Sequence, residues 1–152
     1  MTESETRPNK IRIRPMEPED IDAVLAVDRK ITGQRRAVTY TDLITGDLGS
    51  VLSLSFVAEI NGEVVGFILA QRAVVGEPVT EVGLIQILGV QPEYWRQGLA
   101  TRLVDALLEA CRGRGLNAVR IWVNESDSQL RSLFEKLTFR RGHLIDYTKT
   151  LQ

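Results

Sequence analysis

Hydrophobic residues at helical spacing mark the longest element expected in this chain. Over residues 99–111 an apolar residue recurs at every fourth position, and charged side chains lie on the opposite face. This spacing predicts an amphipathic helix that packs one face on a sheet. Apolar runs over 82–90 and 118–123 flank it and predict two strands. Because a strand, a helix and a strand of this size form a right-handed crossover, these strands should be parallel.

Shorter patterns predict the remaining elements. Alternating apolar and polar residues on both sides of Asn61-Gly62 predict a β-hairpin, because Asn-Gly favours a type I′ turn. The pattern predicts an edge strand over 11–15, helices over 18–33, about 39–46 and 128–137, and a terminal hairpin from 138–142 and 144–151. We therefore expect an α/β (α+β) fold with a mixed, mostly antiparallel twisted sheet of about six to seven strands flanked by about four helices.

Length and composition narrow the class of protein. A chain of 152 residues suits one domain, which we expect over 11–152 behind a flexible tail of residues 1–10. Nineteen basic residues against 20 acidic ones provide no large basic field, so we expect neither nucleic acid nor a membrane as a partner. One Cys and one His exclude a disulfide framework and a Cys/His zinc cluster, so we expect no metal. The polar start is unlike a signal peptide, and a cytoplasmic location is expected.

The start of the long helix carries an unusual charge pattern. Helix starts usually hold acids or hydroxyl caps, because their backbone N–H groups lack intrahelical partners and the helix dipole favours negative charge. Residues 96–102 contain no acid and include Gly98. This combination is typical of an anion or phosphate site. Relief of crowding between helix and strand is the alternative role for Gly98.

The same stretch resembles a known signature. The order strand, Val-x-Pro, then Trp-Arg-Gln-Gly-Leu-Ala resembles the GCN5-related N-acetyltransferase superfamily, whose signature is Gln/Arg-x-x-Gly-x-Gly/Ala. Val90, Pro92, Gly98 and Ala100 match that signature. Trp95 stands at its first position, where the family usually has Gln or Arg.

A second run, 127–139, resembles the family pattern Asn-x-x-Ala-x-x-Leu-Tyr-x-x-x-Gly-Phe. Leu133 and Phe139 match it. Phe134 replaces the Tyr that commonly protonates the departing thiolate in this family. Further differences occur at Asp127, Leu130 and Thr138.

The resemblance implies acetyl-CoA as co-substrate and an amine as acceptor. The CoA pyrophosphate would bind the N–H groups at the helix start, and the pantetheine arm would lie along the end of strand 82–90 like an added strand. The implied cofactor-binding residues are Leu88, Gly89, Val90, Arg96, Gln97, Gly98, Leu99, Ala100, Thr101, Asn124 and Asp127. Plain helix capping is the alternative role for Asn124 and Asp127.

The resemblance also implies a direct transfer of the acetyl group. A backbone N–H near Leu88 would stabilise the oxyanion, and Gln86 could hold a water that accepts the proton of the amine. Tyr147 is a further catalytic candidate, whereas a lone His such as His143 is more often structural or exposed. The basic segment from Arg29 onward borders the acceptor pocket in this family, whereas its charge alone favours a solvated connector. That position makes substrate-binding candidates of Arg29, Gln34, Arg35 and Tyr40.

The resemblance implies an N-acetyltransferase that moves an acetyl group to a primary amine of a small molecule or of a peptide or protein N-terminus. One alternative is a non-catalytic acyl-CoA sensor of the same fold, which Phe134 and Trp95 favour. A nucleotide-binding α/β protein is another, although the chain contains neither G-x-x-x-x-G-K-[ST] nor G-x-G-x-x-G. The exposed edges of the terminal hairpin leave a homodimer open.

Overall fold

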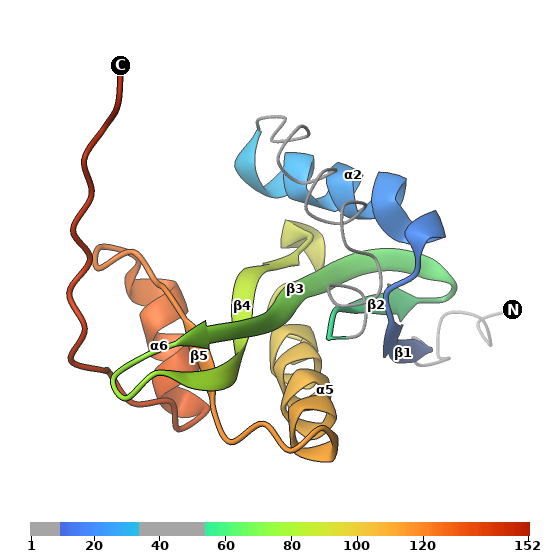
Figure 1. Cartoon of the computed structure of the whole chain (residues 1–152). Helices are drawn as coiled ribbons and strands as arrows, with labels where there is room; N and C mark the ends of the chain where they lie inside the picture. The colour runs from blue at the N-terminus through green and yellow to red at the C-terminus, as the bar shows by residue number, and fades with distance from the viewer. Residues whose placement is uncertain (1–9, 34–53) are drawn as a thin grey trace, which may run out of the picture.

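The computed structural model describes residues 10–33 and 54–152 (Figure 1). Most of the expected N-terminal tail and the short helix expected over about 39–46 lie outside these residues, as do Gln34, Arg35 and Tyr40. None of the helices within the described ranges is long and apolar enough to cross a membrane.

A five-stranded mixed sheet forms the centre of the described chain, with its strands in sequence order. The strands are β1 (Ile11–Pro15), β2 (Phe56–Ile60), β3 (Glu63–Val75), β4 (Thr80–Val90) and β5 (Val119–Ile121). Strands β1 to β4 pair antiparallel, and β4 pairs parallel with β5, which confirms the predicted crossover. The turn between β2 and β3 has positive φ at Asn61 (52°) and Gly62 (84°), as a type I′ turn requires.

Helices cover both faces of the sheet (Figure 1). They are α2 (Ile21–Thr32), which follows the short 3₁₀ turn η1 (Pro18–Asp20), α5 (Leu99–Gly113), which follows η2 (Pro92–Tyr94), and α6 (Ser128–Lys136). Alternate residues of β3 serve the two faces: Phe67 and Leu69 pack in the cluster under α2, whereas Ile68 and Ala70 pack in the cluster under α5 and α6.

The described residues contain five strands and three α-helices, so the predicted count of six to seven strands and four helices is wrong for this part of the chain. The terminal hairpin expected over 138–151 does not form. Thr138 instead ends α6 with a φ of 65°, and the Phe139 N–H donates to the Phe134 carbonyl at 2.9 Å. The two expected strands would also leave only His143 as a loop, whereas hairpin loops need two residues or more.

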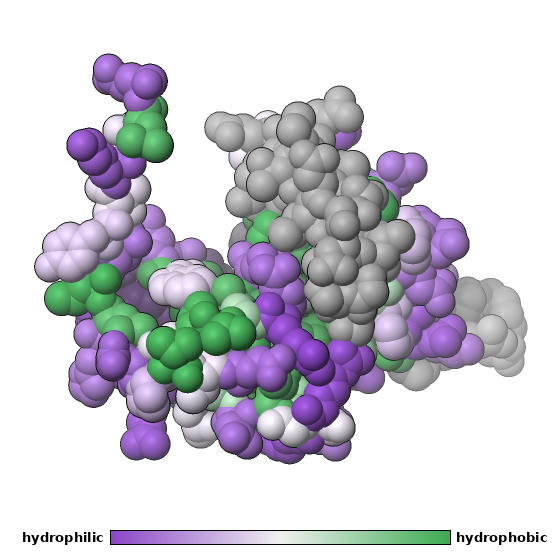
Figure 2. Space-filling view, viewed as in Figure 1, coloured by the Kyte–Doolittle hydropathy of each residue, from purple (hydrophilic) through white to green (hydrophobic). Residues whose placement is uncertain are grey.

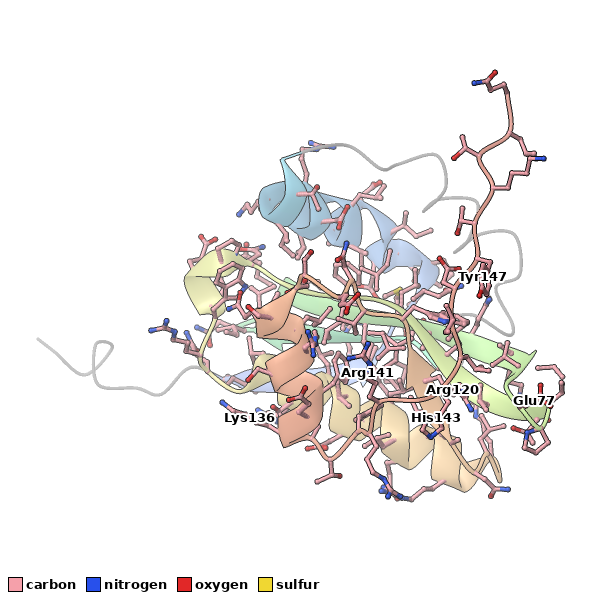
Figure 3. All side chains as sticks on the ribbon, turned by 90° about the vertical axis from the view of Figure 1, so that its left-hand side faces the viewer. Glu77, Arg120, Lys136, Arg141, His143 and Tyr147 are labelled. Carbon is pink, nitrogen blue, oxygen red and sulfur yellow. The ribbon has the colours of Figure 1, made fainter. Side chains whose placement is uncertain are left out.

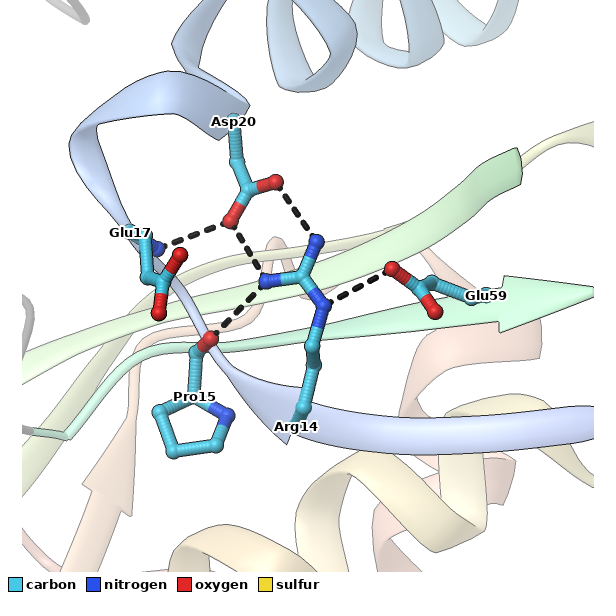
Figure 4. Close-up of polar contacts among 5 residues, drawn as sticks. All are labelled: Arg14, Pro15, Glu17, Asp20 and Glu59. Carbon is cyan, nitrogen blue, oxygen red and sulfur yellow. Dashed lines mark hydrogen bonds and ion pairs between the residues drawn. The ribbon is translucent and has the colours of Figure 1, made fainter. Parts of the chain in front are cut away.

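A compact ion cluster joins β1, η1 and β2 (Figure 4). Arg14 donates from both terminal nitrogens to the Asp20 carboxylate, at 2.7 and 2.8 Å, and from Nε to Glu59 at 2.7 Å. The hydrogen bonds from Arg14 hold the pKa of Asp20 below its usual range, and those carboxylates raise the pKa of Arg14. The cluster therefore holds the start of α2 against the edge of the sheet.

Candidate functional site

Strands β4 and β5 separate partway along the sheet. They pair only from Gly83 opposite Val119 to Ile85 opposite Ile121. Just beyond that point β4 contains a bulge, because Ile85 and Ile87 oppose consecutive residues of β3 and Gln86 has no partner. The remainder of β4, residues 87–90, pairs with β3 but has no strand on its other side in the described structure.

Hydrogen bonds at the two ends of β4 show where its backbone N–H groups point. The Gly83 N–H donates towards β5 at 3.0 Å, and the N–H of Gln91 donates to the Val65 carbonyl of β3 at 2.8 Å. N–H groups alternate in direction along a strand, so those of Leu88 and Val90 point away from β3. They face the side that β5 has left, where a ligand can accept their hydrogen bonds.

The start of α5 lies directly after this open edge. Gly98 is the residue before the helix and has a φ of 77°, with nothing within 4 Å of the position that a Cβ would occupy. Crowding therefore does not explain this glycine, whereas its positive φ and the open space above it do. No acceptor among the described residues takes the N–H groups of 97–101, and the first turn of α5 has no acid. A helix end of this kind is a ready site for an anion.

Trp95 connects the loop before α5 to the end of β4. Its indole Nε1–H donates to the Val90 carbonyl at 2.6 Å, and about half of the side chain is exposed. The loop also bends through Arg96, which has a φ of 67°. Trp95 thus holds the loop in place through its N–H group, which an Arg or Gln at this position could also offer.

A cavity of about 510 Å³ lies between the open edge of β4, the start of α5 and one face of α6. Its lining residues are Leu88, Gly89, Val90, Tyr94, Trp95, Arg96, Leu99, Ala100, Asp127, Gln129, Leu130, Ser132, Leu133 and Lys136. Arg96 and Lys136 bring positive charge to it, and Asp127 brings the one negative charge among these residues. Apolar walls with a cationic, donor-rich end suit an elongated ligand that carries a phosphate group at one end.

A comparison with protein-family models decides the family. Residues 23–139 match the model described as the acetyltransferase (GNAT) family, which is well over half of the chain. The chain belongs to the GNAT family. Within this GNAT protein the match spans most of α2, the open edge of β4, the start of α5 and all of α6.

Solved acetyltransferase structures share the fold of this GNAT chain. It is similar to the aminoglycoside N-acetyltransferase AAC(6′)-Iy in complex with CoA, with a TM-score of 0.80 and 14% identity over 95% of this chain and 97% of that one. It is also similar to a ribosomal-protein-alanine N-acetyltransferase from Brucella melitensis biovar Abortus 2308, with a TM-score of 0.76 and 14% identity over 94% of this chain and 100% of that one. A third similar structure is a Trypanosoma brucei acetyltransferase, with a TM-score of 0.71 and 20% identity over 93% of this chain and 100% of that one.

Most of the predicted cofactor-binding residues lie together in the structure. Seven of them line the cavity, namely Leu88, Gly89, Val90, Arg96, Leu99, Ala100 and Asp127, and Gln97, Gly98 and Thr101 adjoin it at the start of α5. Asp127 also caps α6 by accepting from the Leu130 N–H at 3.0 Å. Asn124 does not line the cavity, and its Oδ1 accepts from the backbone and hydroxyl of Ser126 in a local turn.

The predicted catalytic and acceptor residues are more scattered. Gln86 does not line the cavity, and its side-chain oxygen is buried without a partner among the described residues. Tyr147 is 90% exposed in the C-terminal segment and is not among the lining residues. Arg29 is exposed in the last turn of α2. The other three acceptor candidates lie outside the described residues.

Sequence reasoning missed one wall of the cavity. Gln129, Ser132 and Lys136 of α6 line it, as do Tyr94 and Trp95 of the loop. The α6 positions recur at helical spacing on one face, and this spacing was the signal that could have identified them. Phe134 lies on another face, 4% exposed and edge-to-face with Phe139 at 4.9 Å between ring centroids. No group of three or more His, Cys, Asp or Glu that could hold a metal occurs within the described ranges.

Proposed function

We propose that this chain transfers an acetyl group from acetyl-CoA to a primary amine. The observation that carries the proposal is the open edge of β4 running into an α5 start whose N–H groups have no acceptor in the described structure. The pantetheine arm has amide groups that suit a strand edge, and the pyrophosphate suits a helix start. One cavity joins the two places, so one ligand can occupy both.

The pyrophosphate and the pantetheine arm of acetyl-CoA each have an assigned contact in this proposal. The pyrophosphate accepts hydrogen bonds from the backbone of 96–101, and Arg96 and Lys136 add positive charge. The pantetheine arm bonds to the backbone of Leu88 and Val90. Asp127 caps α6 and thereby orients the α6 wall of the cavity. Asn124 acts through the turn that it forms with Ser126.

The transfer itself requires few side chains. A neutral amine attacks the thioester carbonyl carbon. The oxyanion that forms accepts a hydrogen bond from the backbone N–H of Leu88. The carbon–sulfur bond then breaks, and the CoA thiolate leaves with the electron pair. A water in the cavity takes the proton that the amine loses, because Gln86, the predicted holder of that water, does not line the cavity. Phe134 has no proton to donate, but an alkyl thiol with a pKa of about 8.5 is a fair leaving group without assistance.

The similar structures support nitrogen as the accepting atom. They include an aminoglycoside N-acetyltransferase and a ribosomal-protein-alanine N-acetyltransferase, one named for a small-molecule acceptor class and one for a protein acceptor. Both acceptor classes present amines. A test of this chain therefore needs both small amines and peptides with free N-termini.

The experiment measures free thiol released from acetyl-CoA in the presence of a panel of aminoglycosides, polyamines, amino acids and short peptides. The single Cys111 is buried, so the folded protein adds little thiol signal. Release above the hydrolysis background with at least one amine, together with an acetylated product by mass spectrometry, is expected. Tight binding of acetyl-CoA with no product from any amine would overturn the enzyme and favour the sensor of the same fold.

A further inference from the structure

The open edge of β4 has different surroundings on the two faces of the sheet. Leu88 and Val90 turn towards α5 and α6, where they line the cavity. Ile87 turns to the face that α2 covers, and on that face a Cβ on Gly89 would lie 2.8 Å from the Ile31 Cδ1. Neither isoleucine lines the cavity. The α2 face of this edge is therefore a second surface beside the proposed acetyl-CoA site.

Trp122 lies across the gap between β4 and β5 from this edge. Val119, Ile121 and Val123 pack in the cluster under α5 and α6. Because side chains alternate along an extended chain, Arg120 and Trp122 belong to the α2 face. Pairing with β4 stops at Ile121, and Trp122 is the next residue, where the two strands part. Trp122 therefore borders the gap on the α2 face.

The indole of Trp122 is open to a ligand. Its side chain is 64% exposed, and its N–H has no partner among the described residues, whereas the N–H of Trp95 bonds to Val90. Figure 2 shows hydrophobic groups exposed on the α2 side of the sheet, at the foot of the C-terminal segment. Tryptophan provides a large, rigid contact area and often contributes most to binding where a partner covers it.

Arg120 shares the α2 face of β5 but does not bring its charge to the gap. A Cβ on Gly76, in the turn between β3 and β4, would lie 3.0 Å from the Arg120 Nη2. Figure 3 shows Arg120 on the side of the molecule where Glu77 of that turn lies, away from Lys136 of the cavity. The guanidinium group therefore points away from the open edge of β4. Trp122 is left as the apolar border of the gap on this strand.

The charges on the other side of the gap are positive. Arg29 and Lys30 form the basic last turn of α2, and the Lys30 Nζ lies 3.3 Å from the side-chain oxygen of Gln91. Asp28 precedes this turn but is only 3% exposed. Like charges repel, so this end of α2 disfavours an acceptor that carries several positive charges.

The geometry of the transfer brings the amine to the α2 face. The Leu88 N–H points into the gap within the plane of the sheet, and a pantetheine arm that is added like a strand lies in the same plane. A carbonyl group accepts a hydrogen bond near its own plane, so the thioester also lies roughly in the plane of the sheet. An amine attacks a carbonyl from above or below that plane. Apolar cavity walls, Leu130 and Leu133 among them, cover the α5 and α6 side, which leaves the α2 side for the acceptor.

On the basis of the proposed acetyl transfer, we propose that Trp122 contacts the acceptor and selects a primary amine whose nitrogen lies next to an aromatic or branched apolar group. Trp122 on one side of the gap and the half-buried Ile31 and Ile87 on the other provide apolar contacts along the path of the amine. The same chemistry occurs in free amines and in the first residue of a peptide. Polycations such as aminoglycosides and polyamines lack this apolar group and meet the basic end of α2.

The first experiment compares pairs of acceptors that differ in the group next to the amine. Phe-Gly-Gly is paired with Gly-Gly-Gly, 2-phenylethylamine with ethylamine, and spermidine is the polycation. In at least one pair, kcat/KM should be about tenfold or more higher for the aromatic member, and spermidine should be poorer than that member. The pair that shows the preference tells whether the acceptor is a peptide or a free amine. Acetylation of these amines without any aromatic preference would overturn the selection by Trp122 and leave the acetyl transfer intact.

Substitutions at Trp122 test whether this residue causes the preference. Trp122→Ala should reduce the ratio of kcat/KM within the preferred pair to within about twofold of one, and Trp122→Phe should retain most of it. Val79→Ala is the matched control, because Val79 is 66% exposed in the turn between β3 and β4 and lies away from the gap. Circular dichroism checks that each variant is folded. A ratio that is unchanged in a folded Trp122→Ala protein would contradict the contact.

The third experiment needs no turnover, because the two tryptophans of the chain lie at different surfaces. Trp95 lines the cavity, so CoA should shift its indole N–H signal in an NMR spectrum. Adding 2-phenylethylamine or Phe-Gly-Gly to the CoA complex should then shift the other signal, which is assigned to Trp122 by its absence in Trp122→Phe. If CoA shifts the Trp95 signal but neither amine moves the Trp122 signal at concentrations up to the solubility limit, the acceptor contact is wrong, whether or not acetyl transfer occurs.

Discussion

At the scale of single residues, glycine is required at two positions of the fold for different physical reasons. Gly98 is needed for its positive φ and for open space, whereas Gly83 is needed because a Cβ there would lie 2.6 Å from the Cys111 sulfur. The helical spacing predicted that Cys111 faces the sheet, but no sequence pattern showed which strand residue it meets. Burial also raises the pKa of this thiol, which suits a packing role.

The contact between Gly83 and Cys111 can be tested by a double-mutant cycle. Gly83→Ala should lower the free energy of unfolding by about 1–3 kcal/mol, because its methyl group meets the sulfur in a packed core. In a Cys111→Ala background the same substitution should cost less than half as much, since space has been made. Urea unfolding measures all four proteins. Additive effects of the two substitutions would contradict direct packing.

Phe134 is the residue where the chain departs from the family pattern at a proposed chemical step. The ring is buried beside Phe139 and is not among the residues that line the cavity. Phe134→Tyr should therefore change the acetyl-transfer rate by less than about tenfold, below the usual contribution of a general acid. The substitution should also lower the free energy of unfolding by about 1–2 kcal/mol, since the new tyrosine hydroxyl would be buried without a hydrogen-bond partner.

The pH profile gives the same prediction an independent check. With unassisted thiolate departure, the rate of the wild-type protein should rise with pH as the acceptor amine loses its proton. It should show no falling limb near pH 9 to 10, where a phenol with a pKa of about 10 would lose its proton. A bell-shaped profile whose upper limb disappears in Tyr147→Phe would assign the acid to Tyr147 instead.

At the scale of elements, the crossover and the first hairpin were predictable because their signals are local. Asn61-Gly62 fixes its own turn, and the spacing over 99–111 fixes a buried helix face. The bulge at Gln86 was not predictable, since it depends on how β4 meets β3 rather than on residue type. The terminal hairpin failed because strand character in 144–151 specifies no partner.

The assignment of the Leu88 backbone N–H to the oxyanion can be tested by changing one backbone atom of β4. Replacing Leu88 by the matching α-hydroxy acid turns its amide into an ester and removes the N–H without changing the side chain. If this N–H binds the oxyanion, kcat should fall about 10²-fold or more. The same exchange at Gly89, whose N–H points to β3, should instead cost about 1 kcal/mol of stability and leave kcat within threefold. Similar kcat losses at both positions would contradict the assignment.

The Arg14 cluster predicts an acid-sensitive attachment of η1 and α2 to the sheet. Because its folded pKa is lowered, Asp20 contributes stability that is present above its unfolded pKa of about 3.9 and is lost as pH falls through the folded value. Asp20→Asn should lower the free energy of unfolding by about 2 kcal/mol at pH 7, since it leaves the largely buried Arg14 with less charge compensation.

The difference between wild type and Asp20→Asn should shrink as pH is lowered below about 4. Asp22→Asn changes an exposed acid two residues away and is the matched control, with an expected effect below about 0.5 kcal/mol. Urea unfolding at a series of pH values compares the three proteins. A difference that stays constant down to pH 2.5 would show that the Asp20 charge does not act through this cluster.

At the scale of the whole molecule, the fold brings an unpaired strand edge and the start of a helix to one cavity. The divergence of β4 from β5 exposes a strand edge, the next loop turns directly into α5, and α6 closes the third wall. The family resemblance predicted the first two parts from residues 84–100. The α6 wall and the Trp95 contact with Val90 needed the structure, because they join segments that are distant or irregular.

The central claim is that the start of α5 binds the pyrophosphate of an acyl-CoA, and calorimetric titration of CoA tests it most directly. Asn tolerates a positive φ, so Gly98→Asn fills the space above the helix start with little backbone strain. Gly115→Asn is the matched control, because Gly115 follows the other end of α5 with a φ of 75° and the same open surroundings. We predict that wild type and Gly115→Asn bind CoA alike and that Gly98→Asn binds it weaker by about 2 kcal/mol, roughly thirtyfold. A folded Gly98→Asn protein that binds CoA as tightly as wild type would contradict the account.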